Sequence, residues 1–256
     1  FILASIFRKL SKKYPGESGP FHYTEKSFGK FIGFFVIWGY WISILLVNAS
    51  LAIAVTSYST IFIKNLNDPV LSLSFAVFII ILIGIINAFG IKKVGQFQFI
   101  TTILKIIPLL ATIIIGFFVF NLSNFTPINI SQETNLEALT ITTALTFFAF
   151  LGIESATIPA DGIKNPKSTI PKATMIGTSL TFLIYVLSSI AIIGIMSPSE
   201  IVLSNAPYAD AMGFVLGESA KSIIAIFAII SGLGCLNGWT LLQIEIPKNL
   251  AKKNLL

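Results

Sequence analysis

The sequence predicts an all-α, polytopic membrane protein. Of its 256 residues, 55% are hydrophobic and only 11% are charged, and the mean hydropathy of +0.88 is far above that of a soluble domain. Apolar runs of about 20 residues, the length that crosses the hydrocarbon core as a helix, recur along the whole chain. We therefore interpret residues 1–256 as one transmembrane domain.

The predicted spans follow one another with short connections. An incomplete apolar run covers residues 1–7, and six longer runs follow at 32–62, 70–90, 99–120, 138–160, 174–196 and 221–243. The run at 32–62 is longer than a bilayer requires, and we expect tilt or an interfacial extension to accommodate the excess. Because the chain starts inside an apolar run, we interpret it as a piece of a longer protein or a truncated gene product.

The basic residues gather in alternate loops, which predicts an orientation. The loops before 32, between 90 and 99, between 160 and 174, and after 243 are rich in Lys, whereas the intervening loops carry mostly Asp and Glu. By the positive-inside rule the Lys-rich loops are cytoplasmic. The net charge of +6 is thus explained by the Lys residues of the cytoplasmic loops. We expect the protein to lie in the lipid bilayer of the cell membrane and not to bind nucleic acid.

One acid stands inside an apolar run. Glu154 is the only carboxylate in the interior of a predicted span, and an acid at that depth is costly and is usually kept for function. Gly152 and Ser155 flank it, so the helix could open there and offer backbone groups to a ligand. A neutral acid bonded to a neighbouring helix is the alternative.

Two further spans carry candidate cavity residues. Tyr40, Ser43, Ile44 and Asn48 fall at helical spacings of three, four and eight and so share one face. Packing between helices is the alternative role for Asn48. Trp239 projects from a glycine-rich and therefore thin helix, and membership of the interfacial aromatic belt is its alternative role.

Other function classes receive no support from the sequence. We expect no enzyme, because no nucleophile with a base appears, and no metal or other cofactor. The single Cys235 excludes an intrachain disulfide and a cysteine metal cluster. A channel is disfavoured because neither a ring of charges nor a repeated filter motif is present.

Three stretches resemble the amino acid, polyamine and organocation transporter superfamily, and within it the basic amino acid/polyamine antiporters. They are FAFLGIESA at 148–156, which continues into KNPK at 164–167 and Ile170-Pro171; GCLNGWTLL at 234–242; and residues 15–29 running into Tyr40-Trp41. The resemblance implies a twelve-helix fold of two inverted five-helix repeats, an inverted-repeat transporter fold. This chain would be a partial copy, from the end of helix 2 to helix 8, without the first helix that holds the substrate carboxylate and amino group.

The resemblance also implies site residues. Glu154 corresponds to the proton-coupling acid, the Leu151 backbone meets the substrate amine, and Tyr40 matches an outer gate. The remaining substrate-binding positions are Phe148, which stacks on the head group, Trp239, which also gates the cytoplasmic side, and the cavity-lining Ser43, Ile44 and Asn48. Phe148 departs from the tryptophan of similar family members and is a weaker partner for a cation.

The function that the resemblance implies is secondary antiport of small cationic amino acids or polyamines, such as arginine, ornithine or putrescine, by alternating access around a midplane site. The alternative is a non-transporting remnant, or a partial chain of such a transporter that needs a second polypeptide. The oligomeric state is left open, with a homodimer among the options.

Overall fold

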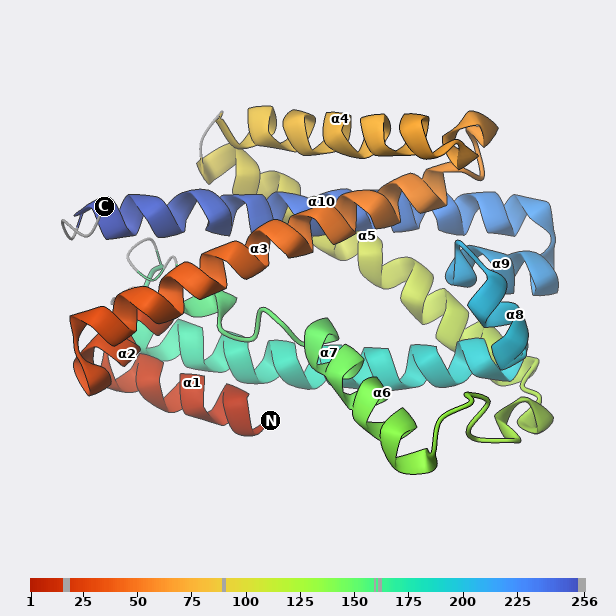
Figure 1. Ribbon diagram of the computed structural model, residues 1–256, viewed down its shortest axis with the longest axis horizontal. Coiled ribbons are helices and arrows are strands. Elements are labelled where there is room, and N and C mark those ends of the chain that lie inside the picture. Colours follow the sequence, from red (N-terminus) through yellow and green to blue (C-terminus); the bar gives the residue numbers. More distant parts are fainter. Residues whose placement is uncertain (16–18, 89–90, 159, 161–162, 253–256) are drawn as a thin grey trace. The chain divides into compact units, whose positions relative to one another are not determined.

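The computed structural model describes residues 1–15, 19–88, 91–158, 160 and 163–252, without side chains for residues 91–98 and 252. The described residues form helices and connecting loops (Figure 1). In chain order the elements are α1 (Ile2–Lys13), α2 (Gly19–Phe28), α3 (Lys30–Ser59), η1 (Lys64–Asn67), α4 (Pro69–Ala88), α5 (Ile91–Phe118), η2 (Leu122–Phe125), α6 (Asn135–Ala149), η3 (Ser155–Thr157), α7 (Pro166–Ile195), α8 (Pro198–Leu203), α9 (Pro207–Leu216) and α10 (Glu218–Lys252).

Among the described residues, five helices are long and apolar enough to cross a membrane, and the chain is a multi-pass membrane protein. They are α3, α4, the part of α5 at Phe99–Phe118, α7 and α10. The predicted run 138–160 is not one helix, because α6 ends at Ala149 and turns follow. The last residues of the predicted run 70–90, and residue 159 of the run 138–160, lie outside the described residues.

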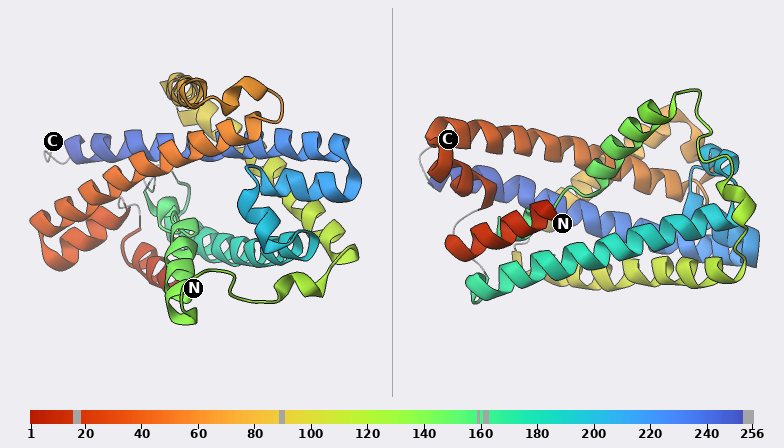
Figure 2. Two further views of the ribbon diagram at one scale, coloured as in Figure 1. Left: turned by 45° about the vertical axis from the view of Figure 1, so that its right-hand side comes forward. Right: turned by 90° about the horizontal axis from the view of Figure 1, so that it is seen from below.

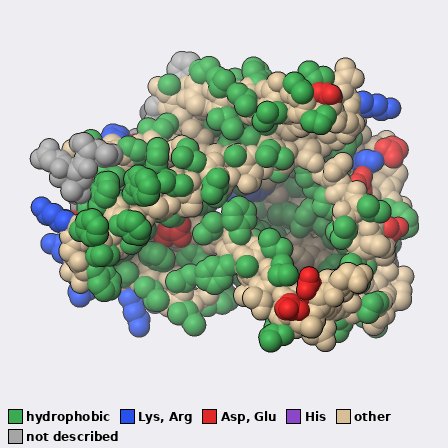
Figure 3. Space-filling model, in the orientation of Figure 1, with side chains coloured by type: hydrophobic (Ala, Val, Ile, Leu, Met, Phe, Trp, Pro, Cys, Tyr) green, Lys and Arg blue, Asp and Glu red, His purple; other side chains and the backbone are tan. Residues whose placement is uncertain are grey.

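The surface of the spanning helices suits lipid. Hydrophobic side chains cover much of the face shown in Figure 3. Along α4, the large side chains of Val70, Leu73, Phe78 and Ile81 are each more than half exposed. Such a helix would be unstable in water, whereas hydrocarbon chains solvate it at no cost.

The chain forms two compact units. Unit 1 consists of Phe1–Ser43, Asn129–Leu183 and Leu242–Leu256, and unit 2 consists of Ile44–Ile128 and Ile184–Leu241. Three long helices, α3, α7 and α10, therefore contribute residues to both units.

Unit 2 packs around small side chains. In one cluster, Ala209 and Met212 of α9 are fully buried against Ile195 at the end of α7 and Ala225 of α10. Accordingly, α9 lies beside the first turns of α10 in each view (Figures 1 and 2). A second cluster joins α3, α4 and α10 through residues that include Val55, Ile83 and Leu236. Small residues let membrane helices approach closely, which strengthens van der Waals packing where no hydrophobic effect acts.

A close approach between helices of unit 2 is made at a glycine of α10. A Cβ placed on Gly234 would overlap the side chain of Thr101 in α5. One turn further along α10, the buried Asn237 side chain accepts a hydrogen bond of 3.0 Å from Asn87 of α4. A glycine contact and an amide pair thus fix α10 against two different helices.

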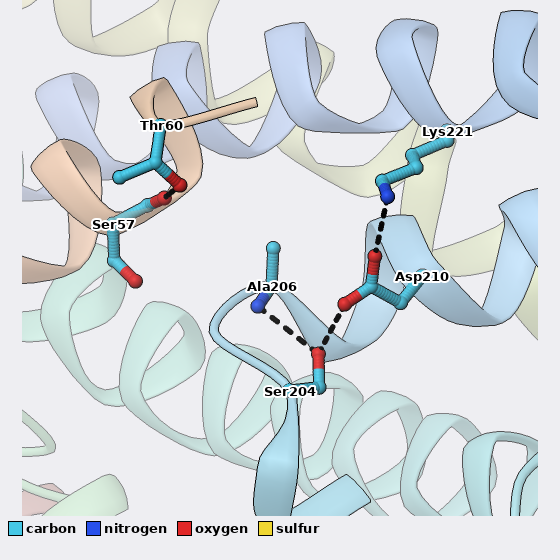
Figure 4. Close-up of polar contacts among 6 residues, drawn as sticks. All are labelled: Ser57, Thr60, Ser204, Ala206, Asp210 and Lys221. Carbon is cyan, nitrogen blue, oxygen red and sulfur yellow. Dashed lines mark hydrogen bonds and ion pairs between the residues drawn. The ribbon is translucent and has the colours of Figure 1, made fainter. Parts of the chain in front are cut away.

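A polar cluster ties α8 and α9 to α10 (Figure 4). The Ser204 hydroxyl donates to the Asp210 carboxylate at 2.5 Å and accepts from the Ala206 N–H at 3.1 Å. Asp210 also forms an ion pair of 3.1 Å with Lys221 at the start of α10. Both charged side chains are less than one third exposed, so their attraction is screened less than that of a surface pair.

We expect Lys221→Met to lower the Tm of the detergent-solubilised protein by about 2 °C, because a partly buried ion pair is worth up to about 1 kcal/mol. Asp210→Asn should have a similar effect, and the double variant should lose little more than either single variant. Lys64→Met is the matched control, since Lys64 is exposed and has no ion pair to another described residue. Additive losses at 210 and 221 would contradict the pairing.

In unit 1, α6 begins with a reciprocal cap. The Thr134 hydroxyl and N–H donate to the Glu137 carboxylate at 2.7 and 3.1 Å, and the Glu137 N–H donates back to Thr134 at 3.4 Å. These hydrogen bonds, from the side chain first and then the backbone, lower the pKa of Glu137 below its ordinary value. The cap satisfies amide groups that the first helical turn leaves without partners.

The cap predicts a loss of stability in acid. A carboxylate with a lowered pKa in the folded state stabilises it fully above the unfolded-chain pKa, and this contribution disappears as pH falls through the folded-state pKa. We therefore expect the wild-type protein to lose more Tm between neutral pH and about pH 3 than Glu137→Gln does. Thermal unfolding in detergent measures this, with Glu133→Gln as an exposed control. Equal losses in wild type and Glu137→Gln would contradict it.

Candidate functional site

The candidate site is built on a break in the helical chain of unit 1. Helix α6 ends at Ala149, where the Phe150 N–H already bonds three residues back, to Phe147. Gly152 then takes a φ of +101°, a conformation that side chains with a Cβ avoid. Residues 151–154 form turns, and η3 follows. The backbone N–H and C=O groups of this segment consequently do not form the continuous hydrogen bonding of an α-helix.

Glu154 lies at this break and faces a neighbouring helix. One carboxylate oxygen, Oε1, accepts a hydrogen bond of 2.6 Å from the Tyr40 hydroxyl of α3 and one of 3.2 Å from the Gly152 N–H. The side chains of Glu154 and Tyr40 are half-buried. Glu154 thus stabilises the turn and joins it to α3. A change in the hydrogen bonding of Glu154 would therefore affect both the turn and α3.

Two hydroxyl groups stabilise the same turn. Ser155 donates to the Gly152 carbonyl at 2.6 Å, and Thr157 donates to the Glu154 carbonyl at 2.6 Å. Thr157 is fully buried. Each of these carbonyls also accepts a backbone N–H, from Ser155 at 3.0 Å and from Thr157 at 2.9 Å. The hydroxyls therefore add a second donor to each carbonyl and stabilise the turn further.

Glu154 also lines a groove of about 760 Å³, a volume suited to a small ligand. The groove belongs wholly to unit 1 and is formed by the start of α1, by α6 with the turn after it, and by α7. Its lining is mainly apolar, with Glu154 as the one acidic side chain among the described residues, and consists of Phe1, Ile2, Leu3, Leu139, Thr142, Thr143, Thr146, Phe147, Phe150, Leu151, Ile153, Glu154, Thr178 and Phe182.

The polar part of the lining is a group of threonines that the sequence pattern alone did not bring forward. Thr142, Thr143 and Thr146 come from α6 and Thr178 from α7. Thr143 and Thr146 donate their hydroxyl hydrogens within α6, to the carbonyls of Leu139 and Thr142 at 2.7 and 2.8 Å. In the sequence, Thr146 stands four residues after Thr142 and three after Thr143, on the same apolar run as Glu154. This helical spacing was the signal from which a shared face could have been predicted.

The predicted site residues of unit 1 divide between the groove and its surroundings. Leu151 and Glu154 line the groove. Phe148 does not: it is 52% exposed, and the neighbouring Phe147 and Phe150 line the groove in its place. Ser43 lies one turn beyond Tyr40 and donates to its carbonyl at 2.7 Å. Glu154 and Tyr40, which the sequence analysis named separately, are hydrogen-bonded to each other.

The remaining predicted residues belong to unit 2. Ile44 is fully buried and Asn48 is 5% exposed, both in α3, so each packs against neighbouring side chains. Trp239 is half-buried in α10. For Asn48, burial agrees with the packing role that the sequence left open as an alternative.

Comparison with known proteins identifies similar sequences over the whole chain. The model of a family described as amino acid permease matches residues 1–256. The chain is 30% identical to a cadaverine/lysine antiporter of Escherichia coli strain K12 over 244 residues, which are 94% of this chain and 54% of that protein. It is 30% identical to an arginine/ornithine antiporter of Pseudomonas aeruginosa, over 98% of this chain and 54% of the relative.

A putrescine transporter of Haemophilus influenzae is 29% identical over 95% of this chain and 56% of its own length. These proteins are named as transporters and antiporters rather than as enzymes. The chain spans about half the length of the curated relatives that it matches.

Proposed function

The chain belongs to the amino acid permease family, and from this membership we propose that it is part of a secondary antiporter that exchanges cationic amino acids or polyamines across the cell membrane. Relatives named for lysine, cadaverine, arginine, ornithine and putrescine support this substrate class. Each of these compounds carries at least one cationic amine or guanidinium group, which an acid can balance.

The observation that carries the proposal is the acid at the broken helix. Glu154 lies at the edge of an apolar groove and bonds to Tyr40 on a different helix. Discontinuous helices with accessible backbone groups are where secondary transporters bind substrate and coupling ions. A proton on Glu154 and a cation in the groove would compete for the same negative charge, which is the simplest basis for coupling.

For the other residues we propose the roles that the resemblance to the transporter family implies. We assign the Leu151 backbone to the substrate amine, Phe148 to the charged head group, and Tyr40 to the outer gate. Trp239 is proposed to bind substrate and to close the cytoplasmic side, and Ser43, Ile44 and Asn48 are proposed as substrate-binding positions on the same grounds. The Lys-rich loops lie in the cytoplasm, as the positive-inside rule predicts.

The test is exchange in liposomes. The 256-residue chain is reconstituted beside a version extended to the length of its relatives, which we call the full-length protein. Both are loaded with unlabelled arginine, ornithine or putrescine. Each labelled compound is then supplied outside. We expect uptake of label only when a cationic compound is inside, with leucine as a neutral control on both sides.

The result also distinguishes the two forms of the proposal. Exchange by the full-length protein alone would mean that residues 1–256 need further helices to complete the site. Exchange by both would mean that the 256 residues suffice. Absence of exchange by the full-length protein with all three cations would overturn the proposed function and favour the non-transporting remnant.

A further inference from the structure

The residue after Tyr40 makes a second link from α3, to α10. The indole N–H of Trp41 donates a hydrogen bond of 2.9 Å to the backbone carbonyl of Gln243. Both residues belong to unit 1 and are half-buried. A tryptophan N–H inside a membrane needs an acceptor, but a backbone carbonyl in the middle of a helix is normally occupied.

A proline removes the usual helical donor to this carbonyl. In an α-helix the carbonyl of Gln243 would accept from the N–H of residue 247. That residue is Pro247, which lies inside α10 and has no N–H. The chain thus lacks one helical hydrogen bond at this level of α10, and the Trp41 indole supplies a donor from a neighbouring helix.

The link fixes the last part of α10, residues 242–252, which we call the α10 arm. Its buried stripe consists of Leu242, Ile246 and Leu250, four residues apart. Ile246 and Leu250 meet Phe21 of α2 and Ile158 around a cavity of only about 20 Å³. The arm therefore packs against the residue that directly follows η3, four positions after Glu154.

Two consecutive residues of α3 thus bond two places where helical hydrogen bonding is incomplete. Tyr40 bonds the acid at the break after α6, and Trp41 bonds the α10 carbonyl to which Pro247 cannot donate. Both bonds depend on the position of the same turn of α3. A shift of the α10 arm would be transmitted to the acid by two routes, through this turn and through the packing on Ile158.

We propose that Trp41 is a positioning residue for exchange: its indole N–H replaces the backbone hydrogen bond that Pro247 removes, and so fixes the α10 arm against the segment that carries Glu154. This inference rests on the proposed antiport function for its effect on rate. The replacement of the hydrogen bond, by contrast, is a property of the folded chain and is measurable without transport.

A double-variant cycle tests the hydrogen bond. Trp41→Phe keeps an aromatic ring but removes the donor, and we expect it to lower the Tm in detergent by about 3 °C. Pro247→Ala returns an N–H to the helix, so Trp41→Phe should cost little in that background. Trp38→Phe, one turn earlier on α3 and 48% exposed, is the matched control and should leave the Tm unchanged. An equal loss from Trp41→Phe in the wild-type and Pro247→Ala backgrounds would overturn the proposal.

Exchange in liposomes tests the positioning role. We expect Trp41→Phe to lower the maximal exchange rate about tenfold with little change in half-saturation concentration, and Trp41→Phe/Pro247→Ala to exchange within about twofold of Pro247→Ala. A general loss of folding would not be rescued by a second substitution in this specific way. If Trp41→Phe alone fails to fold, recovery of the double variant supports the proposal, and failure of both overturns it.

The two readouts separate this inference from the proposed function. Absence of exchange by the wild-type protein, together with a Tm cycle that shows the rescue, would contradict antiport while establishing the Trp41–Gln243 link. Wild-type exchange with no rescue in either readout would leave antiport supported and would refute the role of Trp41.

Discussion

Replacing Glu154 by alanine is expected to lower the rate of cation exchange about a hundredfold, because hydrogen bonds to a charged group contribute about 1.5–3 kcal/mol each. The Tyr40 hydroxyl would lose its acceptor at 2.6 Å and the Gly152 N–H its acceptor at 3.2 Å. The groove would also lose its acidic side chain. The measurement is the initial rate of counterflow by full-length protein in liposomes.

Glu154→Gln separates charge from hydrogen bonding. The amide oxygen still accepts from Tyr40, so the fold of the turn should survive, but the side chain no longer binds or releases a proton. We expect exchange to fall about tenfold and to vary much less with pH than in the wild type. Glu133→Gln, an exposed acid in the loop before α6, should leave both properties unchanged. Wild-type rate and pH dependence in Glu154→Gln would remove this residue from the mechanism.

The second large effect is expected for folding. Gly234→Val should lower the Tm by about 6 °C or prevent folding, because an added side chain would overlap Thr101 at a contact that has no free space. Thr101 is 3% exposed and cannot move away without disturbing α5. Thermal unfolding in detergent and the yield of monodisperse protein measure the effect.

Gly84→Ala is the matched control for this contact. Gly84 lies in α4 of the same unit, and a Cβ there would meet no atom within 4 Å. Because alanine favours a helix over glycine by about 1 kcal/mol, we expect Gly84→Ala to keep or raise the Tm. A similar loss of stability at both positions would mean that the backbone, and not the contact with Thr101, requires glycine at 234.

Much of the fold was predictable because hydropathy reports directly on the solvent. The five helices capable of spanning coincide largely with predicted apolar runs, since lipid demands both length and apolarity. The exception is instructive. The run 138–160 is equally apolar, but Gly152 and the polar pair Glu154 and Ser155 allow the chain to leave the helix after Ala149. Hydropathy does not detect such a break, whereas the residue types do.

The site was predictable only where one stretch of sequence carries the signal. Glu154 is conspicuous in its apolar context, and Tyr40 was proposed as a gate, yet nothing local in the sequence pairs them across 114 positions. The Trp41 bond to Gln243 is similarly remote, and recognising it requires matching a missing N–H on one helix to a donor on another. Which two of the neighbouring Phe147, Phe148 and Phe150 line the groove depends on where α6 ends, a detail of a single turn.

The threonines of α6 have a consequence for which compounds the groove can accept. Thr143 and Thr146 spend their hydroxyl hydrogens on carbonyls of their own helix, so toward the groove their oxygens offer lone pairs and no hydrogen. An ammonium or guanidinium group, which only donates, finds acceptors there. A free carboxylate, which only accepts, finds no donor at these two hydroxyls. At these two positions the wall thus favours groups that donate hydrogen bonds, independently of the charge on Glu154.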